Sequence, residues 1–101
     1  MPFSQLIPRR LLPEAVKKYA PSESGVYGVS NAQEWVYIGE TDNIQGALLD
    51  HLALSHTPLM DRQPTGFVFE VCDPATRWAR LDRLVSEYAP YCNQGLAQGR
   101  V

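Results

Sequence analysis

Apolar and polar residues alternate in short runs that predict a compact series of elements. Residues 12–20, LPEAVKKYA, predict a helix, because Pro13 suits its first position and two lysines fall in its last turn. Two runs rich in Val, Tyr, Ile and Trp, residues 25–30 and 35–39, predict strands. The short polar connection between them makes the pair an antiparallel hairpin.

A second set of elements follows the hairpin. N-cap residues at 41–43 predict the start of a helix, in which apolar residues recur at helical spacing as far as Leu54. Residues 55–66 read as a long polar loop. Residues 66–72 are apolar on both faces and predict a central or covered strand.

The last helix is predicted to start at Asp73, as N-cap, with Pro74 in the first helical position, and to end before Pro90. One face of this helix is apolar, and it consists of Trp78, Leu81, Leu84, Val85 and Tyr88. Helical spacing on this scale indicates a helix that covers a sheet.

The order helix, strand, strand, helix, strand, helix predicts an α+β domain with a small, mainly antiparallel three-stranded sheet flanked by helices. Residues 1–101 form one domain with a core at about 12–93, and residues 94–101 are expected to be a mobile tail. Arg9 and Arg10, in a segment without a sustained period, are expected to be a solvated pair on the surface.

The register of the hairpin decides which side chains share a face. Pairing of Val29 with Trp35 would place Tyr27 opposite Tyr37 on one face of the sheet. The other face would then hold the apolar residues Val26, Val36 and Ile38. A slip of one residue would separate the tyrosines, so this register is a hypothesis.

Composition and charge limit the functions that the chain could have. The chain is 45% hydrophobic and 20% charged, as in ordinary globular proteins. It has no signal-peptide pattern and no apolar run of the ~18 residues that a membrane span needs, so a cytoplasmic location without membrane contact is expected. The net charge of −2 disfavours tight nucleic-acid binding, which usually needs a basic excess. Cys72 and Cys92 have no neighbouring ligand pattern and are predicted to be reduced.

The motif GVY at residues 25–27, followed by YIG at residues 37–39, resembles the pair of motifs that defines the GIY-YIG nuclease family. Further residues in matching order are Thr41, Asn43, Ile44, His51, Leu84, Val85, Tyr88, Pro90 and Asn93. The resemblance spans residues 12–93 and implies the GIY-YIG nuclease fold. Members of the family are metal-dependent endonucleases.

The resemblance also implies roles for individual residues. Tyr27 would act as general base on the attacking water, Tyr37 would orient that water or a phosphate oxygen, and His51 would support the site. Gly39 and Asn43 are further candidate binding positions. The residues alone allow another interpretation, in which the tyrosines form a cross-strand pair and His51 is a half-buried structural residue.

Two positions depart from the family pattern. The resemblance implies an arginine at Ala47, where it would steady the scissile phosphate, and a glutamate at about Leu81, where it would hold the metal. Phosphate cleavage depends on positive charge that stabilises the developing negative charge, and Mg²⁺ needs oxygen ligands. The absence of both the arginine and the glutamate therefore weakens the nuclease chemistry. A carboxylate relocated to Asp82 or Glu40 could replace the missing ligand.

The charged residues near these elements bear on whether the domain could bind a phosphate backbone. Three acidic residues lie at the hairpin exit and on the following helix, namely Glu40, Asp42 and Asp50. Their negative charge disfavours the binding of a phosphodiester there. Arginines recur at every third position of the last helix, where they could follow a phosphate backbone or form its solvated face, and they are Arg77, Arg80 and Arg83.

Three functions follow. The first is a catalytically inactive module with no metal or cofactor, which binds nucleic acid, another protein or a second copy of itself. The second is a divergent endonuclease that uses Mg²⁺ or Mn²⁺ through the relocated carboxylate. The third is a structural scaffold without a ligand.

Overall fold

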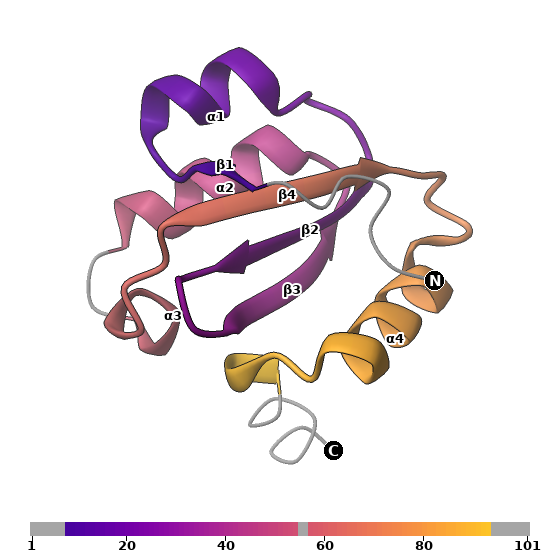
Figure 1. Ribbon diagram of the computed structural model, residues 1–101. Helices are drawn as coiled ribbons and strands as arrows, with labels where there is room; N and C mark the ends of the chain where they lie inside the picture. Colours follow the sequence, from indigo (N-terminus) through magenta and orange to yellow (C-terminus); the bar gives the residue numbers. More distant parts are fainter. Residues whose placement is uncertain (1–7, 55–56, 94–101) are drawn as a thin grey trace.

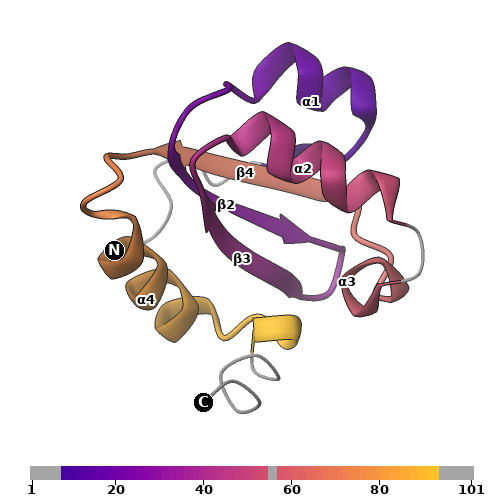
Figure 2. The ribbon, with the colours of Figure 1, turned by 180° about the vertical axis from the view of Figure 1, so that it is seen from behind.

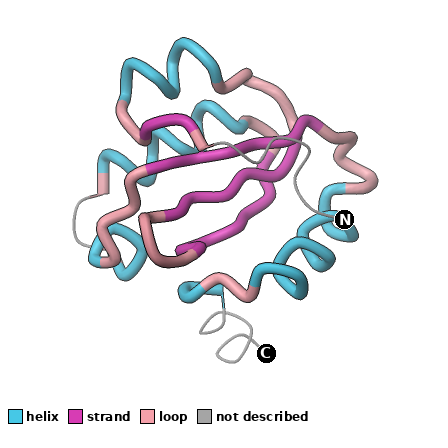
Figure 3. Tube along the Cα trace, viewed as in Figure 1, coloured by secondary structure: helices cyan, strands magenta, loops and turns pink. Residues whose placement is uncertain are grey.

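A computed structural model describes residues 8–54 and 57–93, so the predicted mobile tail at 94–101 lies outside the described residues. The elements are β1 (Arg9–Arg10), α1 (Pro13–Tyr19), β2 (Gly25–Ser30), β3 (Trp35–Thr41), α2 (Ile44–Ala53), α3 (Pro58–Asp61), β4 (Gly66–Val71) and α4 (Arg77–Tyr88). Figure 1 traces them in chain order, and Figure 3 separates helices from strands. The predicted α+β class, with an antiparallel sheet flanked by helices, is confirmed.

The sheet has four strands in the order β1-β4-β2-β3, and all its pairs are antiparallel. The predicted three-stranded sheet is therefore wrong. Arg9 pairs with Phe67 and Arg10 with Gly66, so the predicted solvated pair is an edge strand. Two residues are too few to show a hydrophobic period. The strand is held by backbone pairing with β4, to which residues with almost any side chain can contribute. β4 itself lies inside the sheet, as predicted.

Helices cover both faces of the sheet (Figures 1 and 2). The first core cluster lies between the sheet and α1, α2 and α3, and its buried residues are Leu11, Val16, Ala20, Tyr27, Val29, Val36, Ile44, Leu48, Leu59 and Phe67. The second core cluster lies under α4 and consists of Val26, Ile38, Val68 and Leu84. Within the two described ranges, no helix is long and apolar enough to cross a membrane.

The hairpin register differs from the predicted one by two residues. Tyr27 pairs with Gly39 and Val29 pairs with Tyr37. Because side chains alternate between faces, a shift of two residues keeps them on the same side. The prediction that Tyr27 and Tyr37 share a face is therefore confirmed, although they are not directly opposite.

A bulge explains the shift. Ser30 pairs with Trp35, so Val36 is an extra residue between that pair and the regular ladder. The sequence predicts Val36 beside Val26 and Ile38. In the structure Val36 packs in the first core cluster instead. The bulge turns this one side chain to the opposite face.

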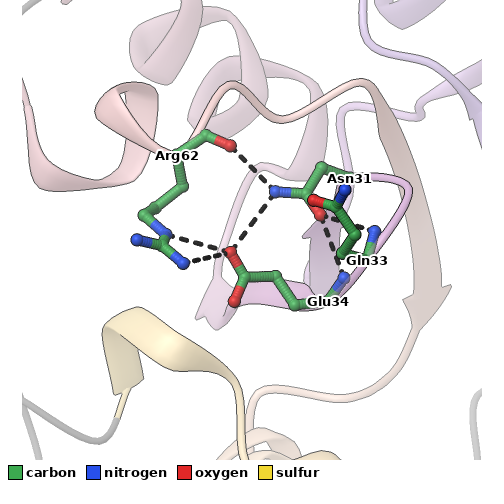
Figure 4. A network of polar contacts seen from close by, with 4 residues as sticks. All are labelled: Asn31, Gln33, Glu34 and Arg62. Atoms are coloured by element: carbon green, nitrogen blue, oxygen red, sulfur yellow. Dashed lines mark hydrogen bonds and ion pairs between the residues drawn. The ribbon is translucent and has the colours of Figure 1, made fainter.

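The hairpin turn is tied to the segment between α2 and β4 (Figure 4). Asn31 Oδ1 accepts hydrogen bonds from the backbone N–H groups of Gln33 and Glu34, both at 2.9 Å. Arg62 Nε donates to Glu34 at 2.9 Å, and Asn31 Nδ2 donates to the Arg62 carbonyl at 2.8 Å. The predicted polar loop thus contains the short helix α3 and is fixed to the sheet by these contacts.

Two helix starts were predicted, with different outcomes. The predicted N-cap of α2 is confirmed, because Asn43 Oδ1 accepts from the Gly46 N–H at 3.0 Å. The predicted cap of α4 at Asp73 is wrong. The Thr76 N–H and hydroxyl both donate to the Asp73 carbonyl, at 3.0 and 3.1 Å, which makes a separate turn before the helix begins at Arg77.

Candidate functional site

Three rings that the sequence singled out meet on the face covered by α2. Tyr27 comes from β2, Tyr37 from β3 and His51 from α2. Their ring centroids are 6.1 Å apart for the two tyrosines, 5.7 Å for Tyr27 and His51, and 5.6 Å for Tyr37 and His51. We call this group the tyrosine–histidine cluster.

Tyr27 is the buried member of the cluster, with 4% of its surface exposed, and its hydroxyl lies 2.8 Å from His51 Nε2. Burial, and then the proximity of Tyr37, Glu40 and Asp50, raises the pKa of the Tyr27 phenol well above its ordinary value. A general base works best when its pKa is near the working pH. The phenol therefore stays protonated at neutral pH, which does not favour the implied role of general base.

His51 is half-buried beside that phenol. Burial lowers the pKa of the imidazole below its ordinary value of 6.5, and nearby Asp50 opposes the shift. The ring is therefore neutral at pH 7 and leaves Nε2 able to accept the Tyr27 hydroxyl proton. Buried and hydrogen-bonded, the pair joins α2 to β2.

We expect the free energy of unfolding to fall as the pH drops from 7.5 to 5.5. Folded His51 binds a proton less readily than the unfolded chain, so its contribution is full above the unfolded pKa of 6.5 and is lost as the pH falls through the lower folded pKa. Urea unfolding at several pH values measures this loss. His51→Gln should be less stable at pH 7.5 and show a smaller fall, whereas an equal fall in both proteins would contradict the assignment to His51.

Gly39 makes room for the two tyrosine rings. A Cβ at this position would lie 2.7 Å from the Tyr27 hydroxyl oxygen and 2.8 Å from Cε2 of Tyr37. Any side chain would displace at least one ring, because such separations are too short for nonbonded carbon. The candidate binding position Gly39 thus has a steric role, as Asn43 has a capping role in α2.

At the two positions that depart from the family pattern, the side chains bring no charge to the cluster. Ala47 precedes His51 by one turn of α2 and packs with its methyl group against the first core cluster. Leu81 lies on α4 and packs against the second core cluster, under the other face of the sheet. Neither residue offers a donor for phosphate or an oxygen ligand for metal.

The candidate replacement carboxylates face elsewhere. Glu40 pairs with Val26 in the ladder, and its Oε1 lies 2.9 Å from Arg77 Nε, in a geometry that makes an ion pair rather than a hydrogen bond. Asp82 is exposed on α4. Within residues 8–54 and 57–93, no three His, Cys, Asp or Glu side chains come together as ion ligands. Cys72 and Cys92 are both free thiols, as predicted.

The arginines of α4 are used mainly to hold the helix on the sheet. Besides its ion pair with Glu40, Arg77 donates from Nη1 to Ser24 Oγ at 3.2 Å. Arg80 grips both oxygens of Glu70 on β4, at 2.7 and 2.8 Å. Arg83 is exposed. With two of the three charges matched by strand carboxylates, this placement favours anchoring over a phosphate-binding stripe.

Asn93 has a role that sequence reasoning missed. Its side chain is buried, with Oδ1 accepting the Ile38 N–H at 2.6 Å and Nδ2 donating to the Ile38 carbonyl at 2.8 Å. β3 is an edge strand, so these backbone groups have no strand partner on that side. The family resemblance included Asn93, but only as part of a closing pattern without a role.

Solved structures share this architecture. The GIY-YIG N-terminal endonuclease domain of UvrC from Thermotoga maritima, bound to its catalytic divalent cation magnesium, is similar with a TM-score of 0.64 and 22% identity, covering 76% of this chain and 93% of that one. Two tyrosine-to-phenylalanine point mutants of that domain, also bound to the divalent cation, give TM-scores of 0.63 and 0.64. Their identities are 22% and 20%, over 76% of this chain and 92% and 93% of theirs. No protein-family model and no curated protein sequence matches the chain. The chain has a GIY-YIG-like fold.

Proposed function

We propose that this chain is a nucleic-acid-binding domain that keeps the GIY-YIG-like fold and has lost the nuclease chemistry. The similar UvrC domain is an endonuclease that carries a catalytic divalent cation. Nucleic acid is therefore the ligand class that the shared fold supports best. The loss of chemistry is supported by the surroundings of the tyrosine–histidine cluster.

One observation carries the proposal of inactivity, namely that residues 8–54 and 57–93 bring neither a cation for phosphate nor an oxygen ligand set for metal to the cluster. Ala47 and Leu81 are both packed into apolar clusters. Removing one group that stabilises developing charge typically costs on the order of 10²-fold or more in rate. Two such losses leave too little stabilisation for measurable cleavage by the family mechanism.

The alternative of a divergent endonuclease needs Glu40 or Asp82 as a metal ligand. Glu40 would first have to leave Arg77, and a buried charge left without its partner is strongly unfavourable. Asp82 follows Leu81 on α4, so its side chain points about 100° further round the helix. Both geometries favour the inactive interpretation.

Nuclease assays test this proposal. Plasmid, branched DNA and RNA are incubated with the protein in Mg²⁺ or Mn²⁺, and we expect no cleavage above the buffer control. Tyr27→Phe is the matched variant, because it removes one oxygen and keeps the ring. Cleavage by the wild type that disappears in Tyr27→Phe would overturn the proposal, whereas equal cleavage by both proteins would identify a contaminant and leave the domain inactive.

A further inference from the structure

Basic residues are unevenly distributed along the chain. Four of its nine basic residues and one of its eleven acidic residues fall in residues 9–18. Within the part of the chain that the structure describes, ion pairs engage Arg62, Arg77 and Arg80 but none of these four. The unmatched positive charge is thus concentrated on β1 and α1, and consists of Arg9, Arg10, Lys17 and Lys18.

A groove runs between β1 and α1, beside Arg9, Arg10 and Lys18. It is lined by Pro8, Arg9, Arg10, Leu12, Glu14, Ala15 and Tyr19. Two of its residues are large and apolar yet substantially exposed, Leu12 at 42% and Tyr19 at 41%. The surface therefore combines an apolar floor with a basic rim. We call it the β1–α1 groove, and Figure 1 shows the two elements side by side.

Arg9 is held in place within the groove. Its guanidinium carbon lies 3.9 Å from the centroid of the Tyr19 ring, and Lys18 Nζ lies 5.3 Å from the same centroid. Stacking on Tyr19 fixes the plane of the guanidinium, and this planar fork of donors suits phosphate oxygens.

We propose that the β1–α1 groove binds single-stranded nucleic acid, with Arg9, Arg10 and Lys18 contacting phosphates and bases lying on the exposed surfaces of Leu12 and Tyr19. This inference rests on the proposed nucleic-acid-binding function and adds the place and the strand type. It separates binding from the tyrosine–histidine cluster, with which the groove shares no residue.

Charge and shape both favour this occupant. Two carboxylates, Asp50 and the more distant Glu40 that faces α4, act electrostatically on the cluster and help to raise the pKa of Tyr27. A phosphate backbone is attracted to the β1–α1 groove and repelled from the cluster. A duplex keeps its bases stacked inside, so only a single strand can use the apolar floor.

The test compares two variants that change the net charge equally. Arg10→Gln with Lys18→Gln removes two positive charges at the groove, and Arg83→Glu changes the charge by the same amount on the far element α4. Arg10 and Lys18 are both exposed, and glutamine is a good helix former at position 18, so the fold should be kept. Binding to a labelled single-stranded oligonucleotide is measured from low to physiological salt.

We expect the Arg10→Gln, Lys18→Gln variant to bind more weakly and to lose about 1.4 from the slope of log affinity against log salt, for two phosphate contacts on a single strand. Arg83→Glu should keep most of the wild-type affinity and slope. Tyr19→Ala should weaken binding at least about fivefold if bases lie on the ring. A duplex of the same sequence should bind less tightly.

Each contrary outcome identifies a different failure. Absence of wild-type binding to any nucleic acid at low salt would overturn the proposed function. Wild-type binding that the Arg10→Gln, Lys18→Gln variant retains, or that Arg83→Glu weakens equally, would overturn only the placement in the β1–α1 groove. Tighter binding to the duplex would overturn the strand type.

Discussion

Gly25→Ala is expected to lower the free energy of unfolding by about 3 kcal/mol or more, the upper end of the cost of overpacking. A Cβ here would overlap the Glu70 carbonyl oxygen and lie 2.7 Å from Ile44 Cδ1 and 3.0 Å from Val71 Cα. Gly25 pairs with Val71 on one side and Thr41 on the other. The backbone cannot move away from one neighbour without breaking a ladder.

Urea unfolding followed by circular dichroism measures this loss. Gly66→Ala is a suitable control, because a Cβ there would meet mainly the side chain of Pro8, which is exposed and lies beside the edge strand β1. The fall in the free energy of unfolding should be clearly smaller for Gly66→Ala than for Gly25→Ala. Equal losses in the two variants would show that the cost comes from strand flexibility at any glycine rather than from the close approach of β2 and β4.

The elements of the fold were predictable wherever a hydrophobic period extends over several residues. β2, β3, β4 and α2 each bury one or both faces, so their sequences carry the period of the structure. β1 has two residues and α3 has four, and neither is long enough to show a period. The bulge at Val36 was also unpredictable, because it depends on how two strands meet and not on either strand alone.

The candidate site was predictable in its rings but not in its charges. A register shift of two residues keeps Tyr27 and Tyr37 on the same face of the sheet. The error in the predicted hairpin register therefore did not separate them. The ion pair of Arg77 with Glu40 joins residues from different elements, which the helical period of α4 cannot reveal. A stripe of arginines therefore looked available in the sequence, while the structure uses two of the three to anchor the helix.

A contact between residues far apart in the sequence gives the second large effect. Asn93 lies 55 residues from Ile38 and satisfies both backbone groups of that residue on the open edge of β3. Asn93→Ala would leave a buried N–H and a buried carbonyl without partners. Each costs about 1–3 kcal/mol, so we expect a total loss of about 2–6 kcal/mol, measured by urea unfolding.

Amide hydrogen exchange at Ile38 distinguishes this mechanism from a loss of packing. In Asn93→Ala the Ile38 amide should exchange much faster, because its acceptor is gone. Unchanged exchange at Ile38, despite a loss of stability, would assign the effect to the cavity instead.

Asn93→Asp tests the donor separately. At neutral pH a carboxylate accepts the Ile38 N–H but cannot donate to the Ile38 carbonyl, so this variant should also be destabilised. Protonation restores an O–H donor, and the deficit relative to wild type should therefore shrink as the pH falls below about 5. A deficit that stays constant with pH would show that the Nδ2 hydrogen bond contributes little. A shrinking deficit would establish that one side chain acts as the missing neighbouring strand, closing the edge of the same hairpin that carries both tyrosines.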